Sequence, residues 1–217
     1  AAGLCHAALG SDTGGSIRQP AAFTGTVGFK PTYGRVSRHG LIAYASSFDQ
    51  IGPFTTNVAD AAKIMEVISG PDQYDATALQ NPLPAAVKKA PKKVAYLKTA
   101  IDHPKVDEHA RKAFQAQLEL LENAGVQVEP VEFDLLDVLV PVYYIITTAE
   151  ASSNLARFDG VHAGFRHEEG TDLESIYKLS RSEGFGTEVQ RRIMLGTFVL
   201  SSGYYDAYYG KAQSVRR

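Results

Sequence analysis

One feature constrains the fold of this chain more than any other: the glycine-rich run GSDTGGSIR at residues 10–18. Its adjacent glycines, Gly14 and Gly15, can adopt positive φ without the steric penalty of a Cβ atom. The backbone can therefore bend sharply and point consecutive N–H groups at one spot beside the hydroxyl of Ser16. Donors of this kind stabilise the oxyanion of acyl transfer, and each contributes about 3–4 kcal/mol. The run favours a serine nucleophile on an exposed turn.

Two plainer interpretations of the run stay open. Glycine-serine loops are common as simple turns, and some cradle phosphate groups. A phosphate-binding loop carries a lysine after its glycines, whereas Ile17 and Arg18 stand there, so this alternative fits less well. Ser11 and Asp12 are expected to hydrogen-bond backbone groups of the turn. Arg18 is expected to pair with a buried carboxylate that fixes the loop.

The composition is that of an ordinary globular domain without a broadly basic surface. The 217 residues are 44% hydrophobic and 21% charged, with a formal net charge of -2. No apolar run reaches membrane-spanning length and no secretory segment opens the chain, so no membrane association is expected. The lone cysteine, Cys5, suits a reducing compartment, and its small apolar neighbours predict a buried packing residue. The bacterial cytoplasm is the expected location, with an organelle as the alternative. The six histidines lack metal-ligand spacing, so no metal is expected.

The hydrophobic pattern of the first part predicts mixed α/β structure. A short apolar stretch at 4–10 is expected to form a buried strand that delivers the turn at its carboxyl end, followed by a short helix at 16–22. A helix is predicted at 58–69, with Asn57 as its N-cap and Gly70 as its terminator.

The rest of the chain begins with a long connection. Four prolines and weak periodicity predict a surface connection at 71–92, more consistent with an insertion loop than with a domain boundary. A strand at 93–98, a helix at 106–124 and a strand at 126–133 form a predicted βαβ unit. The chain beyond residue 139 is predicted to be mainly helical.

The segment Leu9–Asp60, which contains the glycine-rich run, closely resembles the amidase signature family of serine amidohydrolases. The likeness continues through YYII at 143–146, EASSNL at 150–155, RFDG at 157–160, EGFG at 183–186 and LSSGYYDAYY at 200–209. The resemblance implies the amidase signature fold, a mixed β-sheet flanked by helices in a three-layer α/β/α arrangement. Residues 1–217 would then form the central part of that domain, with 71–92 a surface connection inside it.

For catalysis, the resemblance implies a Ser-Ser-Lys triad in which Ser16 is the acylated nucleophile. The oxyanion donors would be the main-chain N–H groups of Thr13, Gly14, Gly15 and Ser16. In the family, the relay serine lies in a Gly-Gly-Ser-Ser-Gly-Gly-Ser run just before the segment with which this chain begins, and the lysine lies farther upstream. The chain is therefore expected to be an internal piece of a protein roughly twice as long. On its own it is expected to be inactive towards glutamine, because a serine hydroxyl needs an adjacent base.

Within the family, the resemblance is greatest to the glutaminase subunits of tRNA-dependent amidotransferases. It implies that a tyrosine and an arginine hold the substrate glutamine, assigned to Tyr143 and Arg192 with Tyr144 and Arg191 as rivals. A planar guanidinium matches the two acceptor oxygens of the α-carboxylate. A surface salt bridge is a competing role for either arginine. An acidic residue beyond Arg217 is expected to meet the substrate ammonium.

The same resemblance implies partners outside this chain. The B and C subunits complete the amidotransferase, mischarged tRNA is held mainly by the B subunit, and ATP and Mg²⁺ act there. No cofactor is implied for this chain itself. The sequence leaves open whether the acceptor is Glu-tRNA or Asp-tRNA and whether glutamine or asparagine is the ammonia donor. A stand-alone amidase and a non-catalytic interaction module remain alternatives.

Overall fold

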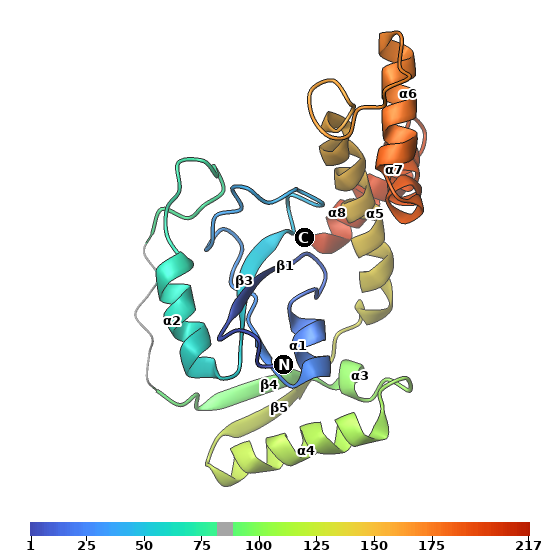
Figure 1. Cartoon of the computed structure of the whole chain (residues 1–217). Helices are drawn as coiled ribbons and strands as arrows, with labels where there is room; N and C mark the ends of the chain where they lie inside the picture. The colour runs from blue at the N-terminus through green and yellow to red at the C-terminus, as the bar shows by residue number, and fades with distance from the viewer. Residues whose placement is uncertain (82–88) are drawn as a thin grey trace. The chain divides into compact units, whose positions relative to one another are not determined.

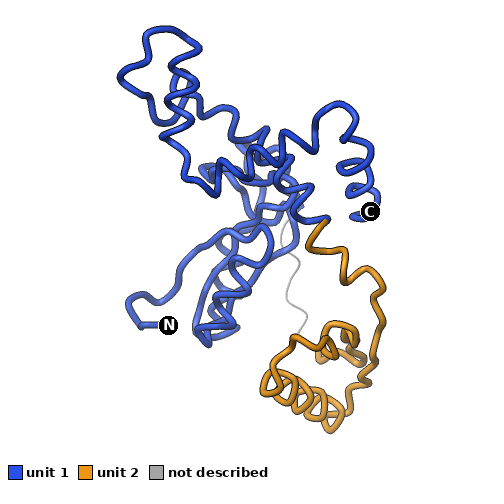
Figure 2. Tube along the Cα trace, turned by 90° about the vertical axis from the view of Figure 1, so that its right-hand side faces the viewer, with its two compact units in different colours: residues 1–84, 142–217 blue, residues 85–141 orange. Residues whose placement is uncertain are grey.

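A computed structural model describes residues 1–81 and 89–217. The chain divides into two compact units, unit 1 with residues 1–84 and 142–217 and unit 2 with residues 85–141 (Figure 2). The mixed α/β class predicted from the sequence is confirmed, because both units contain helices and strands. The described strands form two separate sheets, so the three-layer arrangement stays a prediction for the complete domain.

Unit 1 contains a three-stranded antiparallel sheet with strand order β1-β3-β2. The strands are β1 (Ala8–Asp12), β2 (Val27–Gly28) and β3 (Gln50–Thr55). In Figure 1, β1 and β3 lie between helix α1 (Arg18–Thr24) and helix α2 (Val58–Ile68). The chain therefore leaves β1 directly into the glycine-rich turn, as the sequence predicts.

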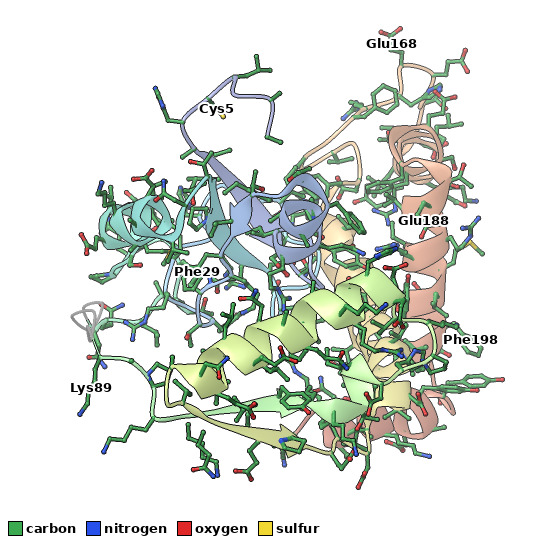
Figure 3. All side chains as sticks on the ribbon, turned by 90° about the horizontal axis from the view of Figure 1, so that it is seen from below. Cys5, Phe29, Lys89, Glu168, Glu188 and Phe198 are labelled. Carbon is green, nitrogen blue, oxygen red and sulfur yellow. The ribbon has the colours of Figure 1, made fainter. Side chains whose placement is uncertain are left out.

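The first strand begins later than predicted, and the expectation that it is buried is wrong, because only Asp12 among its residues is buried. It covers Ala8–Asp12 instead of 4–10, because its ladder with β3 extends to the pair formed by Asp12 and Gln50. Residues 1–6 precede the ladder and are exposed, so the prediction of a buried Cys5 is wrong. Figure 3 shows Cys5 on this leading segment, outside the sheet. The small neighbours that suggested packing carry too little apolar area to bury the segment.

The two helices of this region form close to their predicted positions. Helix α2 begins after Asn57, whose side-chain oxygen accepts a hydrogen bond from the N–H of Asp60 at 2.9 Å and so caps the helix. It ends at Ile68, and Gly70 follows the C-cap with a φ of 147°. Helix α1 begins two residues later than predicted, at Arg18, because the Asp12 side chain engages N–H groups at its start.

The second part of unit 1 is helical, as predicted. Its elements are helix α5 (Leu136–Asn154), which enters from unit 2, the 3₁₀ turn η1 (Leu155–Arg157), helices α6 (Leu173–Gly184) and α7 (Thr187–Leu200), the π-helix η2 (Tyr205–Gly210) and helix α8 (Lys211–Arg216). Helix α7 crosses α5 at Gly196, where a Cβ atom would come 1.9 Å from the carbonyl oxygen of Thr148. The two backbones therefore touch, which brings Arg192, one turn earlier on α7, next to Tyr144 of α5.

Unit 2 contains the predicted βαβ unit. Strands β4 (Lys93–Leu97) and β5 (Gln127–Val131) pair in parallel, and α3 (Lys98–Ile101) and α4 (Glu108–Asn123) lie between them in the sequence. Asp107 caps α4, because its carboxylate accepts hydrogen bonds from the N–H groups of His109 and Ala110. This unit is the part of the chain in which local sequence pattern and structure agree most closely.

The predicted connection at 71–92 has neither helix nor strand in its described parts, 71–81 and 89–92. Its central residues, 82–88, lie outside the described residues. One of the two boundaries between the units falls within this stretch, and the other falls between residues 141 and 142. Among the helices that the structure describes, none is both long and apolar enough to cross a membrane.

Candidate functional site

Ser16 is exposed, while the residue after it is completely buried. The Ile17 side chain packs where each strand of the sheet presents a glycine, namely Gly10, Gly28 and Gly52. A Cβ atom at these positions would lie 3.4, 3.0 and 3.2 Å from Ile17, respectively, so a larger residue at any of them would crowd it. The sheet therefore anchors the turn directly beside Ser16 and leaves the serine side chain at the surface.

The carboxylate of Asp12 organises the turn from within. It is fully buried and accepts hydrogen bonds from the N–H groups of Gly15 at 2.7 Å, Ile17 at 3.3 Å and Arg18 at 3.4 Å. The Arg18 guanidinium donates to both carboxylate oxygens, through Nε at 3.0 Å and Nη2 at 3.1 Å. Asp12 is thus the acid that Arg18 meets, which the sequence alone left open.

The pKa of Asp12 lies below its ordinary value. Burial raises it, but the hydrogen bonds from Arg18, Gly15 and Ile17 favour the charged form and outweigh burial. The carboxyl is therefore ionised at neutral pH. Its oxygens already accept several hydrogen bonds, so Asp12 holds the turn and is poorly placed to take a proton from Ser16.

The backbone N–H groups predicted to form the oxyanion hole are not equivalent in this structure. Gly15 has a φ of 121°, which favours glycine, and its N–H is already donated to Asp12. Within the described residues, the N–H groups of Thr13, Gly14 and Ser16 have no hydrogen-bond acceptor. These three groups remain available to meet a developing negative charge.

The predicted role of Ser11 in holding the turn is not seen. Ser11 is an exposed residue of β1, opposite Ile51 in the ladder, and its side chain makes no hydrogen bond to the turn. Successive side chains of a strand point to opposite faces, so Asp12 points inward and Ser11 outward. Of the two residues expected to hydrogen-bond the backbone of the turn, Asp12 does so.

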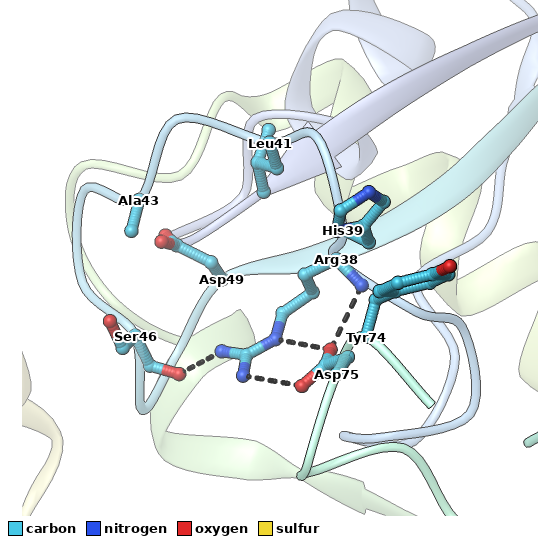
Figure 4. A pocket seen from close by; sticks show the side chains of 8 residues that line it. All are labelled: Arg38, His39, Leu41, Ala43, Ser46, Asp49, Tyr74 and Asp75. Carbon is cyan, nitrogen blue, oxygen red and sulfur yellow. Dashed lines mark hydrogen bonds and ion pairs between the residues drawn. The ribbon is translucent and has the colours of Figure 1, made fainter. Parts of the chain in front are cut away.

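A second buried carboxylate, Asp49, joins the turn to the segment that follows β2. Its Oδ1 accepts a hydrogen bond from the Thr13 hydroxyl at 2.5 Å, and its Oδ2 accepts from the N–H groups of Tyr44 and Ala45 at 2.9 and 3.0 Å. Asp49 also lines a pocket of about 140 Å³ in which Arg38 is ion-paired with Asp75 (Figure 4). No local pattern predicts this link, because Thr13 and Asp49 are 36 residues apart.

Tyr143 lies against the nucleophile turn. A Cβ atom at Gly14 would fall 2.7 Å from two ring carbons of Tyr143 and 2.9 Å from its hydroxyl, so the ring occupies the space that glycine leaves. Phe48 and Tyr144 pack edge-on against this ring at centroid distances of 6.1 and 5.5 Å. Burial raises the pKa of Tyr143, so its hydroxyl stays protonated and can act as a donor at neutral pH.

Arg192 lies next to the aromatic cluster formed by Phe48, Tyr143 and Tyr144. Its Nε donates to Glu188 at 2.9 Å, and its Nη1 donates to the Tyr44 hydroxyl at 3.0 Å. The guanidinium also lies over the rings of Tyr44 and Tyr144, 5.4 and 5.9 Å from their centroids. The hydrogen bond to Glu188 raises the pKa of Arg192 above its ordinary value, so the group is permanently charged.

The structure separates the rival pairs named from the sequence. Tyr143 contacts the turn, whereas Tyr144 contacts Arg192. The Arg191 side chain is 72% exposed and pairs with Glu188 at 2.6 Å, while that of Arg192 is 31% exposed. Tyr143 is therefore the tyrosine that contacts the turn, and Arg192 is the less exposed arginine, although substrate binding by either stays a prediction. Sequence reasoning missed Tyr44 and Glu188.

Ser16 and the free N–H groups of its turn can perform the attack and the charge stabilisation of acyl transfer. The guanidinium of Arg192 is a cation that can meet an anionic group of the substrate. What they do not supply is a base. Asp12 is committed to the turn, and the pKa of Arg192 is far too high for proton transfer at neutral pH. A serine on this turn therefore needs a proton acceptor beyond the residues that surround it here.

Comparison with known proteins gives consistent results. The family model described as amidase matches residues 1–217. The A subunit of glutamyl-tRNA(Gln) amidotransferase from Prochlorococcus marinus (strain MIT 9312) is 52% identical over 221 residues, covering 100% of this chain and 46% of that protein. The protein of the same name from Geobacillus kaustophilus (strain HTA426) is 54% identical over 222 residues, covering 100% of this chain and 45% of its own length. The chain thus spans less than half the length of these relatives.

Solved structures show the same fold. The crystal structure of the A subunit of glutamyl-tRNA(Gln) amidotransferase from Thermotoga maritima matches 98% of this chain and 42% of its own, with a TM-score of 0.72 and 45% identity. The native peptide amidase from Stenotrophomonas maltophilia matches 97% of this chain and 44% of its own, with a TM-score of 0.68 and 26% identity. Since the family model covers every residue and these structures share the fold, this chain belongs to the amidase family.

Proposed function

We propose that this chain is the nucleophile-bearing part of the glutaminase subunit of a tRNA-dependent amidotransferase. One observation carries the proposal: the exposed Ser16 lies on a turn that buried Asp12 holds and that the ring of Tyr143 covers. The half-buried cation of Arg192 is connected to the same cluster through Tyr44. Relatives named as the A subunit of glutamyl-tRNA(Gln) amidotransferase, about half identical in sequence, support the choice among amidases.

In the proposed reaction, the Ser16 oxygen attacks the side-chain amide carbon of glutamine and forms the Oγ–C bond. The hydroxyl proton passes to a relay serine and lysine, which we assign to a part of the protein outside these 217 residues. The N–H groups of Thr13, Gly14 and Ser16, with Gly15 as a further predicted donor, stabilise the tetrahedral oxyanion. The C–N bond then breaks, the nitrogen takes the proton and leaves as ammonia, and water cleaves the ester to release glutamate.

Tyr143 and Arg192 would hold the substrate in this scheme. The guanidinium of Arg192 suits the α-carboxylate of glutamine, because two parallel N–H groups match two carboxylate oxygens. The Tyr143 hydroxyl, which is protonated at neutral pH, can donate a hydrogen bond to a substrate oxygen above the turn.

The proposal includes partners that complete the reaction. The B and C subunits would form the amidotransferase with this one in the bacterial cytoplasm. The B subunit would receive the ammonia, bind the mischarged tRNA and use ATP and Mg²⁺, so this chain itself needs no cofactor. The family resemblance and the names of the relatives support this assignment.

The test uses the full-length protein assembled with its partners. Ser16→Ala should abolish glutamine-dependent amidation of the mischarged tRNA while leaving amidation with added ammonium salt intact. Ser11→Ala is the matched control, because Ser11 is an exposed serine of β1 outside the turn network. It should keep both activities. Glutamine-dependent amidation that survives in Ser16→Ala would refute the assignment of the nucleophile. The 217-residue chain alone should release no ammonia from glutamine.

A stand-alone amidase is the second candidate, because the fold also matches a peptide amidase. Such an enzyme would share the Ser16 chemistry but would not need the carboxylate of glutamine. Hydrolysis of simple amides by the full-length protein without partners, at rates above those for glutamine, would favour it. Dependence on partners and on the α-carboxylate would favour the glutaminase.

A further inference from the structure

The contacts of Arg192 indicate how one end of its guanidinium is kept available. Five N–H groups radiate from the guanidinium in a fixed plane. Glu188 takes the Nε–H, and the Tyr44 hydroxyl takes one N–H of Nη1. Among the described residues, the second N–H of Nη1 and both N–H groups of Nη2 find no acceptor. Nη1 and Nη2 together form the edge of a guanidinium that a carboxylate binds in bidentate fashion.

We propose that Tyr44 and Glu188 are positioning residues, which fix the Arg192 guanidinium so that its Nη1–Nη2 edge binds the substrate α-carboxylate. This assignment rests on the proposed glutaminase function and names two residues that act through Arg192. Neither residue needs to touch the substrate.

Glu188 fixes the guanidinium from the same helix. It precedes Arg192 by four residues on α7, so both side chains lie on one face of the helix. Its second oxygen binds Arg191 at 2.6 Å, which keeps the carboxylate in one orientation. Both arginines hold the pKa of Glu188 below its ordinary value. Glu188 therefore stays charged at neutral pH and neutralises part of the guanidinium charge before substrate arrives.

Tyr44 fixes the guanidinium from a distant segment. Its ring lies under Arg192, and its hydroxyl, 3.4 Å from the buried Thr147 hydroxyl of α5, accepts the Nη1 hydrogen bond. Its backbone N–H donates to Asp49, which also holds the Thr13 hydroxyl. Tyr44 thus connects Arg192 to the nucleophile turn through two hydrogen-bonded side chains. The connection gives the cation and the nucleophile a fixed spacing, as recognition of one substrate at two points requires.

The experiment compares two amides in the full-length enzyme complex: glutamine, and 4-aminobutanamide, which is glutamine without its α-carboxylate. Tyr44→Phe keeps the ring and removes the hydroxyl, and Glu188→Gln keeps the size and removes the charge. Each should raise KM for glutamine about three- to tenfold, the range expected for the loss of one hydrogen bond of ordinary net strength, with kcat within about twofold. Neither variant should change kcat/KM for 4-aminobutanamide. A structural defect would lower the rates with both amides.

The matched control is Glu174→Gln, which removes an exposed i,i+4 pair with Lys178 from α6. It should change no kinetic constant. The assignment is overturned if the variants leave KM for glutamine unchanged while Arg192→Ala raises it, or if they affect both amides equally. A wild-type complex that hydrolyses no glutamine would overturn the proposed function itself, and this assignment with it. These failures are distinguishable because the first two require an active wild type.

Discussion

The two units of the molecule differ in whether they bury carboxylates. In unit 1, Asp12, Asp49 and Asp75 are 0, 2 and 8% exposed, and each accepts hydrogen bonds from several donors. In unit 2, the described ion pairs lie at the surface, such as Lys112 with Glu108 at 3.5 Å, whose side chains are 69 and 63% exposed. Buried carboxylates hold the segments of unit 1 in place, whereas the described ion pairs of unit 2 are exposed on its helix and strands.

This difference has an energetic basis. An exposed pair contributes about 0–1 kcal/mol, because solvent screens it and ordering two long side chains costs entropy. Removing one partner from a buried charged network costs about 3–5 kcal/mol, because the remaining group is left desolvated and unpaired. The comparison therefore predicts that the nucleophile turn depends on a few individual side chains, while unit 2 tolerates the loss of any one of its surface charges.

The largest effect is expected for Asp12→Asn. The variant replaces an acceptor of five hydrogen bonds by an amide whose NH₂ meets other donors. Because Arg18 is half-exposed and can turn to solvent, we expect a value below that range, about 2–3 kcal/mol of lost unfolding free energy. Urea unfolding followed by circular dichroism measures it, and glutamine hydrolysis should be lost as well. A variant as stable as the wild type would mean that the nucleophile turn does not depend on the buried carboxylate of Asp12.

Acidification should weaken unit 1 through the same groups. The pKa values of Asp12 and Asp75 are lowered in the folded protein, chiefly by hydrogen bonds with Arg18 and Arg38 that outweigh burial. Their stabilisation is present above the unfolded-state pKa, near 3.8, and is lost as pH falls through the lower folded pKa. The expected loss is about 1–3 kcal/mol.

Hydrogen exchange monitored by mass spectrometry between about pH 5 and about pH 2 tests this prediction, after correction for intrinsic rates. Protection should fall first in the peptides that contain the turn and residues 72–79. Asp12→Asn should flatten the pH dependence of the turn peptide. Equal loss of protection in peptides from both units would contradict the prediction.

Gly14→Ala tests how closely the turn and Tyr143 fit. The added Cβ would meet the Tyr143 ring at 2.7 Å, so the ring must move, whereas the backbone of Gly14 needs no positive φ. We expect a loss of about 1–2 kcal/mol in stability from overpacking, with a larger effect on glutamine hydrolysis. Gly210→Ala is the control, because the φ of Gly210 is −59° and its added Cβ would come no nearer than 3.7 Å to the carbonyl oxygen of Tyr205. Comparable effects of the two substitutions would argue against contact at the turn.

The same contrast separates what the sequence predicts from what it does not. The βαβ unit and helix α2 follow from local patterns and caps such as Asn57, because their signals lie within a few residues. The contact between Tyr44 and Arg192 joins residues 148 positions apart, and no periodicity or spacing encodes it. Ser16 is found from local glycines, whereas the residues that orient its surroundings come from long-range packing. The prediction that Cys5 is buried is wrong, because small neighbours indicate burial only where another surface packs against them.

Lys112→Ala on α4 is expected to give the smallest effect. It tests whether unit 2 tolerates the loss of one exposed ion pair. The substitution removes the i,i+4 partner of Glu108 and leaves Glu108 in the first turn, where its charge favours the helix dipole. Alanine has the higher helix propensity, which offsets part of the lost pair, so the net change should stay below about 0.5 kcal/mol. Urea unfolding at low salt and at about 1 M salt measures it, and salt should reduce the difference further because it screens exposed charges. A loss above about 1 kcal/mol that resists salt would mean that unit 2, like unit 1, depends on individual charges.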